Sequence, residues 1–406
     1  MKRMKTTLRR IVRPLLALTL LLLLLILSSC RQMQMPMTGS DREEVESTSG
    51  KRITVLDNPE PAAYGKSTSD AIVRLDGVRG MDWLSEDKIL VGHPNRDFEP
   101  EQAEGMDWYP DNLYVLSLAD KSESPLLPKN ENQGFAQVSP DRMKVFYKTY
   151  SLQANTGMGH LYDFSTGKSV SFTEPDAMDI QNGRWVDNDT VAYATIDGSI
   201  WLAHTGSATP RKLLDTGIPF VTNIDYLNNR LYYSSLKGAM ITATLDGQKP
   251  ALLTTDRVVW MVPSPDEKRL AVVRRLKSGS MELNVTDLQG NVIQAIAQDA
   301  QIFGVAWSPD GSKLAYAGIA PNGTVRSIYV ADPSTGLSAP LSLDAKFMDG
   351  LLRWSPTGNR IMVSTSQLDE QQRNRSVTFL VRASNTESTE RSDSTEGADS
   401  VERVGK

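Results

Sequence analysis

The chain has 406 residues, with 44 Lys and Arg against 49 Asp and Glu, three His and one Cys. This length fits one large all-β domain as well as two ordinary domains, and a hydrophobic content of 40% is enough for a sizeable core. The single Cys excludes a disulfide framework and a thiolate metal cluster, and three scattered His argue against a His-rich metal site. We therefore expect neither a metal site nor a cofactor.

The charge is unevenly distributed along the chain. Residues 1–29 hold six cations and no acid, so the remainder carries 38 cations against 49 acids, a net charge of −11. A surface of this sign repels phosphate backbones, so we expect no nucleic-acid partner. It is also repelled by an anionic membrane, and any membrane attachment therefore needs a specific anchoring segment or lipid modification.

The N-terminus supplies such a segment. Its cations precede an apolar run of 14 residues, Pro14–Leu27, and small residues follow. A basic region, a short apolar region and small residues are typical of a secretory signal, and 14 residues are too few to span a hydrocarbon core of about 30 Å. An uncleaved membrane anchor is the alternative interpretation.

The apolar run ends in Leu27-Ser28-Ser29-Cys30, which resembles the lipobox of bacterial lipoproteins. The resemblance implies cleavage before Cys30 and a diacylglycerol thioether on its sulfur, which anchors the protein to the membrane outside the cytoplasm. Residues 31–51 are polar and without periodicity, and residues 384–406 are rich in Ser, Thr, Glu and Asp. We expect a signal peptide at 1–29, the lipidated Cys and a flexible tether at 30–51, one folded domain at 52–383 and a disordered tail at 384–406.

The folded part contains a repeat. Apolar residues and an aromatic residue precede a turn of Ser-Pro-Asp-Gly type, and strand-forming residues follow, most clearly in Val305–Tyr316 and Leu352–Val363. Pro presets φ at the second turn position, and Gly supplies the positive φ that closes the turn. Weaker copies contain Val138–Tyr147 and Ser264–Val272, and three more keep mainly the aromatic residue and the turn, at Trp83, Trp185 and Tyr226.

The spacing of the repeat predicts the fold. The residues that precede the turns stand at positions 83, 138, 185, 226, 263, 307 and 354, with intervals of 55, 47, 41, 37, 44 and 47 residues. Blades of a β-propeller need about 40–45 residues each. The sequence therefore predicts a single all-β propeller of four-stranded antiparallel blades, seven in number with six as the alternative. Either Arg52–Leu56 or Ala71–Leu75 supplies a strand that closes the ring. A β-sandwich does not explain the constant period.

These WSPDG-like repeats resemble those of TolB-type β-propellers, which are related to the propellers that precede the hydrolase domain of prolyl oligopeptidases. The resemblance covers roughly residues 70 to 383. It implies a non-enzymatic scaffold that presents a propeller face to another envelope protein. The chain departs from the pattern in blade number, because TolB itself is similar to a six-bladed ring. No G-x-S-x-G motif of a hydrolase is present.

The sequence predicts no catalytic residue. P-loop, dinucleotide-binding and H-E-x-x-H motifs are absent, and His93, His160 and His204 fall in different blades without a shared motif. We therefore expect an interaction scaffold, present as a monomer. The alternative is a glycan or small-ligand binder, or a propeller enzyme of lyase or hydrolase type, that uses the mouth of the central channel. Convergence of several Asp, Glu, Arg or His side chains at the channel distinguishes the two.

An insertion in the first blade, residues 92–112, carries the candidate partner-binding residues. It is a long acidic loop in which Trp108 and Tyr109 stand side by side, with Asp97 and Glu99 nearby in the sequence. Long loops on a rigid β scaffold are where binding residues concentrate. Adjacent aromatic residues among acids indicate stacking on a sugar or contact with a basic segment of a partner. The alternative is a lid that packs on the first blade.

Overall fold

The computed structural model describes residues 42–46, 52–56 and 72–383, the last range with short gaps at 104–105, 152–155, 208, 229, 235–237, 245–249, 255–256, 320–324, 342–351 and 369–372. The predicted signal peptide, the lipidation site at Cys30 and the predicted tail at 384–406 lie outside the described residues. In the described part no helix is long and apolar enough to cross a membrane.

The chain divides into two compact units, residues 1–66 and 67–406. In the first unit, strands β1 (Arg42–Glu46) and β2 (Arg52–Leu56) form an antiparallel pair. Strand β1 lies within the stretch that the sequence predicts to be a flexible tether. Strand β2, one of the two candidates for closing the ring, pairs with β1 and takes no part in a blade.

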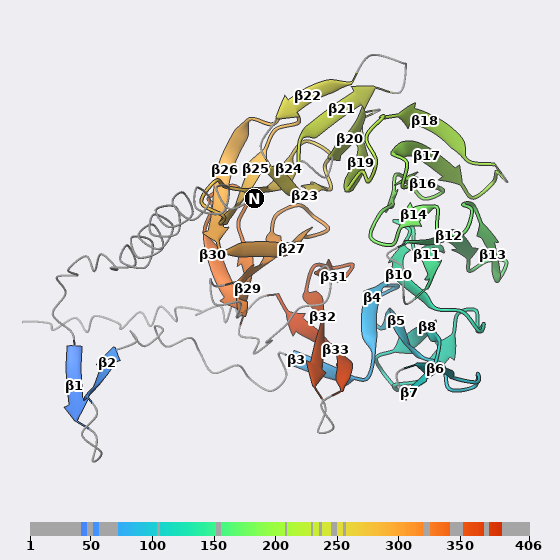
Figure 1. The fold of residues 1–406 in the computed structure, drawn as a ribbon, viewed down its shortest axis with the longest axis horizontal. Helices are drawn as coiled ribbons and strands as arrows, with labels where there is room; N and C mark the ends of the chain where they lie inside the picture. Colours follow the sequence, from blue (N-terminus) through green and yellow to red (C-terminus); the bar gives the residue numbers. More distant parts are fainter. Residues whose placement is uncertain are drawn as a thin grey trace, which may run out of the picture. The chain divides into compact units, whose positions relative to one another are not determined.

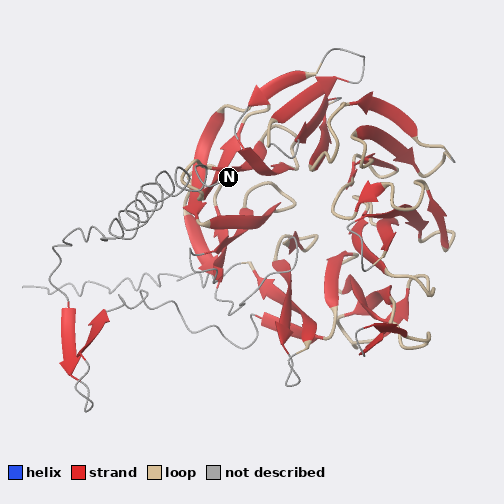
Figure 2. Cartoon of the chain, viewed as in Figure 1, coloured by secondary structure: helices blue, strands red, loops and turns tan. Residues whose placement is uncertain are grey.

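The second unit is a ring of seven antiparallel blades, each built on four strands (Figures 1 and 2). Blade 1 contains β4 (Arg79–Trp83), β5 (Lys88–Pro94), β8 (Asp111–Ser117) and β9 (Glu123–Pro125). Blade 2 contains β10 (Gln133–Val138), β11 (Lys144–Tyr150), β12 (Thr156–Asp163) and β13 (Lys168–Ser171), with β14 (Met178–Asp179) paired to β12. Blade 3 contains β15 (Arg184–Trp185), β16 (Thr190–Ala194), β17 (Ser199–His204) and β18 (Arg211–Asp215).

The remaining blades follow in chain order around the ring. Blade 4 contains β19 (Asn223–Leu227), β20 (Arg230–Ser234), β21 (Met240–Thr244) and β22 (Ala251–Thr254). Blade 5 contains β23 (Arg257–Pro263), β24 (Leu270–Arg275), β25 (Met281–Thr286) and β26 (Val292–Asp299). Blade 6 contains β27 (Gln301–Trp307), β28 (Leu314–Ile319), β29 (Val325–Ala331) and β30 (Ser338–Leu341). Blade 7 contains β31 (Arg353–Trp354), β32 (Arg360–Leu368), β33 (Asn374–Arg382) and β3 (Ile72–Asp76).

The seven residues that mark the repeat all lie at the end of an innermost strand. Six of them are the last residue of that strand, as Trp307 is in β27, and Tyr226 is the last but one in β19. The prediction of seven four-stranded antiparallel blades is therefore confirmed, and the six-bladed alternative is wrong. The repeat finds the blades because each copy contains the inner strand, its turn and the start of the second strand.

The ring is closed by the N-terminal strand β3. It pairs along its whole length with β33, from Ile72 opposite Val381 to Asp76 opposite Val377. Its Leu75 is buried in a cluster that also contains Trp83 of blade 1. Of the two candidate closing segments, Ala71–Leu75 is therefore the one that the structure uses. This pairing covers the edge of β33 that does not face β32.

The blades pack face to face, so their middle strands are buried on both sides. All five residues of β16 are buried, and one continuous core cluster joins Leu283 of blade 5 to Trp307 and Leu314 of blade 6. Strands covered on both faces are apolar without alternation. Burial of this kind stabilises a fold by about 25 cal/mol for each Å² of apolar surface removed from water.

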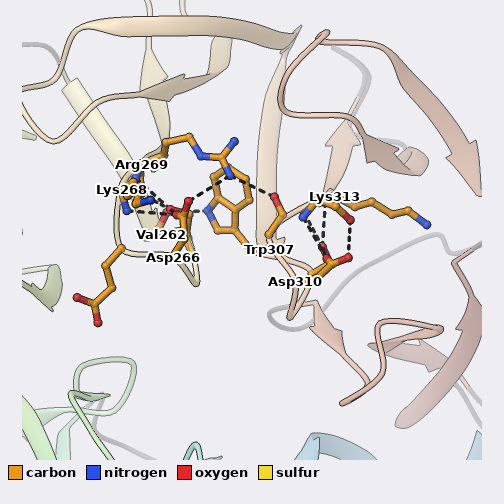
Figure 3. Close-up of polar contacts among 12 residues, drawn as sticks. Val262, Asp266, Lys268, Arg269, Trp307, Asp310 and Lys313 are labelled. Atoms are coloured by element: carbon orange, nitrogen blue, oxygen red, sulfur yellow. Dashed lines mark hydrogen bonds and ion pairs between the residues drawn. The ribbon is translucent and has the colours of Figure 1, made fainter.

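The recurring Trp has a specific role between blades. In Figure 3, the indole Nε1 of Trp307 donates a hydrogen bond of 3.0 Å to the carbonyl oxygen of Val262, in the inner strand of the preceding blade, and the guanidinium of Arg269 lies 5.0 Å from the ring centroid. The same bond is repeated by Trp83 to Arg353, Trp185 to Gln137 and Trp354 to Ala306. Each bond reaches the residue directly before the marker of the preceding blade.

The turn chemistry of the repeat is also visible in blade 6 (Figure 3). The hydroxyl of Ser308 donates to Asp310 at 2.6 Å, and the backbone N–H of Lys313 donates to the Ser308 oxygen at 2.9 Å. The hydrogen bond from Ser308 lowers the pKa of Asp310 to about 2. In blade 7 the Asp position holds Thr357. Its hydroxyl and N–H both donate to Glu86 of blade 1 at 2.8 Å, so a carboxylate from the neighbouring blade completes this turn.

Candidate functional site in the central cavity

The candidate partner-binding residues lie on the insertion of blade 1 and do not line the central cavity. Within the insertion, β6 (Glu101–Ala103) and β7 (Met106–Trp108) form a small antiparallel pair. The Trp108 side chain is 42% exposed. Tyr109 is half-buried, because the guanidinium of Arg96 lies 4.9 Å from its ring centroid. Asp97 and Glu99 are exposed. The Trp108 side chain is thus exposed, whereas Tyr109 packs against Arg96.

The three histidines do not form a site together. His93 stacks on Tyr114 with ring centroids 3.9 Å apart and contacts Glu123 at 2.9 Å. His160 is buried against Tyr147, and this burial lowers its pKa to about 4. Among the described residues, no group of three or more His, Cys, Asp or Glu side chains is arranged to hold a metal ion.

The inner strands surround a cavity of about 330 Å³ that residues from all seven blades line. This volume lies at the lower end of the range of small-ligand pockets. Its lining is Arg79, Gly80, Met81, Phe135, Ala136, Gln137, Lys148, Ile180, Gln181, Asn182, Gly183, Arg184, Thr222, Asn223, Ile224, Trp260, Phe303, Gly304, Arg353 and Ser364.

The register of the repeat explains one residue of the lining in each of blades 1 to 6. The residue three positions before the marker lines the cavity in blades 1 to 6, and these residues are Gly80, Phe135, Asn182, Asn223, Trp260 and Gly304. The corresponding residue of blade 7 lies outside the described residues. None of these positions was predicted from the sequence. These residues can be identified in the sequence because each stands three positions before the marker of its blade. This requires knowing that the inner strand faces the channel.

Four cations converge on the cavity, and no acidic residue is part of its lining. They are Arg79, Lys148, Arg184 and Arg353. Convergence of charged side chains is the observation that favours a ligand site over a scaffold without one. Charges that line a cavity act on a ligand more strongly than charges at the open surface, because less water lies between them and the ligand.

Lys148 is an unusually buried cation. Its side chain is 1% exposed, its Nζ lies 3.4 Å from the carbonyl oxygen of Phe135, and it lies 4.2 Å from the ring centroid of Phe146. Burial lowers the pKa of Lys148 to about 7. A buried ammonium without a carboxylate partner is unfavourable. Lys148 therefore gains from any anion that enters the cavity.

Arg353 and Asp225 are also incompletely paired. The Nε of Arg353 is buried without a hydrogen-bond partner, and burial lowers the pKa of this guanidinium. Asp225, 2% exposed, accepts one contact from Arg184 Nε at 3.2 Å, while its second oxygen has no partner. Burial raises the pKa of Asp225 to about 7, against the opposing charge of Arg184. Unpaired buried groups with shifted pKa values are candidates for a functional role.

Phe135 enters the cavity through a strained backbone. It has a φ of 51°, in the left-handed region, at a bulge of β10. Gly304 holds the equivalent position of blade 6 with a φ of 66°. A Phe in this conformation is unfavourable by about 1–3 kcal/mol, and such strain clusters at functional sites. The guanidinium of Arg79 lies 5.3 Å from the Phe135 ring centroid, so the strained residue carries a ring against a cavity cation.

The side-chain amides that line the cavity form hydrogen bonds between neighbouring blades. Gln137 donates to the carbonyl oxygen of Gly183 at 2.9 Å, and Asn182 donates to that of Val221 at 2.8 Å. Asn223 donates to the carbonyl oxygen of Val259 at 3.3 Å and to Ser234 at 2.7 Å. Each amide therefore reaches the next blade. At least one N–H of each amide is engaged within the protein.

Comparison with known proteins places the fold. No protein-family model matches the chain, and no curated protein shows sequence similarity to it. An oligogalacturonate lyase in complex with manganese is 14% identical, with 84% of this chain and 96% of that chain covered and a TM-score of 0.57. The WD40 β-propeller domain of Doa1 is 10% identical, with 78% and 96% covered and a TM-score of 0.53. The chain is a seven-bladed β-propeller.

The structural neighbours also include TolB from Acinetobacter baumannii, at 15% identity over 76% of this chain and 65% of that chain, with a TM-score of 0.43. At these identities the comparisons show the propeller fold alone, and the neighbours differ in function. The function of this chain has to be argued from its own cavity and surface.

Proposed function

We propose that this protein is a lipid-anchored, extracytoplasmic β-propeller that binds a small anionic ligand in its central cavity. The observation that supports binding is the cavity lining, which holds four cations and no acid, with the Nε of Arg353 unpartnered. This proposal takes the small-ligand alternative of the sequence analysis in place of the interaction scaffold.

The physical reason lies in the energetics of buried charge. Removing a cation from water is unfavourable unless a partner compensates it. Arg184 is paired with Asp225, but the Nε of Arg353 is buried without a hydrogen-bond partner. An anion that enters the cavity supplies this partner. The binding free energy of the anion then includes the unfavourable free energy of the buried cation, which the anion removes. We propose binding without chemical conversion of the ligand.

One variant tests the proposal without any ligand. Replacing Arg353 with Met keeps the volume similar and removes the buried charge, so Arg353→Met is expected to raise the melting temperature of the ligand-free protein. Arg382→Met, at an exposed residue of the same blade, is the control and is expected to leave it unchanged. A large loss of stability in Arg353→Met shows that Arg353 is structural and overturns the proposal.

The lipid anchor rests on the lipobox-like residues 27–30. Metabolic labelling with a palmitate analogue is expected to mark the wild-type protein and to leave Cys30→Ala unlabelled. Cys30→Ala is also expected to lose its membrane attachment or to retain its signal peptide. Equal membrane retention of both proteins without lipid label supports the uncleaved anchor instead.

A second candidate function is docking of a protein partner on the insertion of blade 1. The observation that favours it is the exposed Trp108, with the exposed carboxylates of Asp97 and Glu99 on the same insertion. Exposed aromatic residues supply much of the contact energy at interfaces, and acids select a basic partner surface. Association of this kind weakens as salt screens charges over about 8–10 Å.

Crosslinking in intact cells tests this second function. Trp108→Ala is expected to abolish capture of the partner without a change in melting temperature, whereas Tyr109→Ala also loses the contact with Arg96. Leu337→Ala, at another exposed apolar residue, is the matched control. Equal capture by Trp108→Ala and the control excludes Trp108 as the docking residue.

A further inference from the structure

The charge of the cavity lining is confined to one side of the ring. Arg353 belongs to blade 7, Arg79 to blade 1, Lys148 to blade 2 and Arg184 to blade 3. These four blades are consecutive, because β3 closes blade 7 beside blade 1 (Figure 1). The lining that blades 4, 5 and 6 contribute is uncharged: Thr222, Asn223, Ile224, Trp260, Phe303 and Gly304. The cavity therefore has a cationic side and an uncharged side.

Two aromatic side chains stand on the uncharged side. Trp260 and Phe303 come from the inner strands of blades 5 and 6, at irregularities in the pairing of β23 and β27. A bulge redirects a side chain from the position that regular pairing gives it. Both rings are only half-buried although they lie in the interior of the ring of blades. They offer apolar faces on which a flat ring of a ligand stacks.

The polar groups of the lining are poorly suited to a polyhydroxylated ligand. Recognition of a sugar needs free donors and acceptors along the ring, and unmatched hydroxyl groups are unfavourable in a buried site. One N–H of Gln137, one N–H of Asn182 and both N–H groups of Asn223 already form hydrogen bonds within the protein. An apolar ring requires no such partners. The lining thus favours an aromatic ring over a sugar ring.

From this polarity we infer that the ligand is a small aromatic carboxylate, with its acid group on the side of blades 7, 1, 2 and 3 and its ring between Trp260 and Phe303. The inference rests on the proposed function and specifies its ligand class. A guanidinium binds a carboxylate through parallel N–H bonds, and the Nε of the cavity residue Arg353 has no hydrogen-bond partner within the protein. The volume of about 330 Å³ suits a ligand of one or two rings.

Four small molecules test separately whether binding depends on the aromatic ring and on the carboxylate charge of the ligand. Phenylacetate carries the ring and the charge, phenylacetamide the ring alone, acetate the charge alone, and galacturonate a charge on a hydroxylated ring. Affinities are obtained from the dependence of the melting temperature on probe concentration. We expect phenylacetate to bind at least about tenfold more tightly than each of the other three, because only it matches both sides of the cavity.

Variants of the protein test the same assignment. Trp260→Leu and Phe303→Leu are each expected to weaken phenylacetate binding at least about fivefold and to leave acetate binding within about twofold. Arg353→Gln is expected to weaken both. Trp201→Leu, at a half-buried Trp outside the cavity lining, is the matched control and should bind phenylacetate as the wild type does. Two aromatic variants are used so that the test survives if one of them fails to fold.

Two results overturn the inference. If acetate or galacturonate binds as tightly as phenylacetate, the cavity takes anions without regard to an aromatic ring, and the proposed function stands while the ligand class is wrong. If phenylacetate does not bind, the ligand class is also wrong. In that case the ligand-free variant Arg353→Met tests the proposed function separately. A raised melting temperature still supports an anion site in the cavity, and a large loss of stability argues against it.

Discussion

The indole N–H of Trp83 donates a hydrogen bond of 3.0 Å to the carbonyl oxygen of Arg353. This bond joins the first blade to the last one and holds the backbone of a cavity residue. Arg360 of blade 7 adds a contact over the Trp83 ring at 5.0 Å and an ion pair with Glu86 at 3.1 Å. The junction that closes the ring is thus also a wall of the candidate ligand site.

We predict that Trp83→Phe affects both stability and ligand binding. The variant leaves the partly buried carbonyl of Arg353 without its donor, which lowers the free energy of unfolding by about 1–3 kcal/mol. It also loosens the backbone of Arg353, so affinity for phenylacetate should fall. Trp307→Phe removes the equivalent bond to Val262, which does not line the cavity, and should lose only stability. Urea unfolding and probe titration of both variants check this, and equal affinities contradict it.

Closure of the ring by β3 predicts that N-terminal deletions lower stability only when they extend into this strand. Removing residues 1–66 should leave the melting temperature of the propeller unchanged, because residues of the second unit alone close the ring. Extending the deletion through Asp76 removes the buried Leu75 and uncovers an edge of β33. The free energy of unfolding should then fall by at least about 3 kcal/mol. Similar melting temperatures for the two truncated proteins argue against the role of β3.

The positive φ of Phe135 predicts an unusual order of stability among its variants. Phe135→Gly and Phe135→Ala lose the same ring, but only Gly adopts φ near 51° without strain. The Gly variant should therefore be more stable than the Ala variant by about 1–2 kcal/mol. Gly304→Ala at the equivalent position of blade 6 should lose a similar amount. Chemical denaturation measures all three, and an Ala variant as stable as the Gly variant contradicts the assigned strain.

Asp225 predicts a pH dependence of stability in a defined window. Its pKa is raised from 3.8 to about 7 in the folded protein, because burial disfavours the charged carboxylate. The folded state therefore keeps a proton that the unfolded state loses between about pH 4 and 7, and the contribution of Asp225 to stability falls as the pH rises through this window. The loss is at most about 4 kcal/mol, since each pKa unit corresponds to about 1.4 kcal/mol.

Unfolding of the wild type and of Asp225→Asn between pH 4 and 8 measures this contribution. The wild type should lose stability relative to Asp225→Asn as the pH rises, because an amide does not titrate. Asp215→Asn, at an exposed carboxylate that contacts Lys212 at 3.4 Å, is the control and should show little difference. Parallel curves for the wild type and Asp225→Asn contradict the raised pKa.

The sequence by itself predicted seven blades, with six as the alternative, and the position of each inner strand. This was possible because the turn chemistry is local: Ser308 and Asp310 bond within a few residues of one another, and Trp307 stands directly before them. Because the pattern is local, its repeat period can be read from one sequence without a structure. The choice of closing strand was not local. Arg52–Leu56 and Ala71–Leu75 both read as strands, and only pairing with β33 distinguished them.

Only the tertiary structure decided where the function lies. The sequence pointed to the acidic insertion, because adjacent aromatic residues in a long loop are visible without a fold. Arg79, Lys148 and Arg184 stand in different copies of the repeat and carry no common motif. Their convergence follows from closure of the ring, which brings the inner strands, and for Lys148 the second strand of blade 2, around the same axis. A periodic sequence therefore predicts the walls of the cavity, but closure of the ring determines which side chains meet inside it.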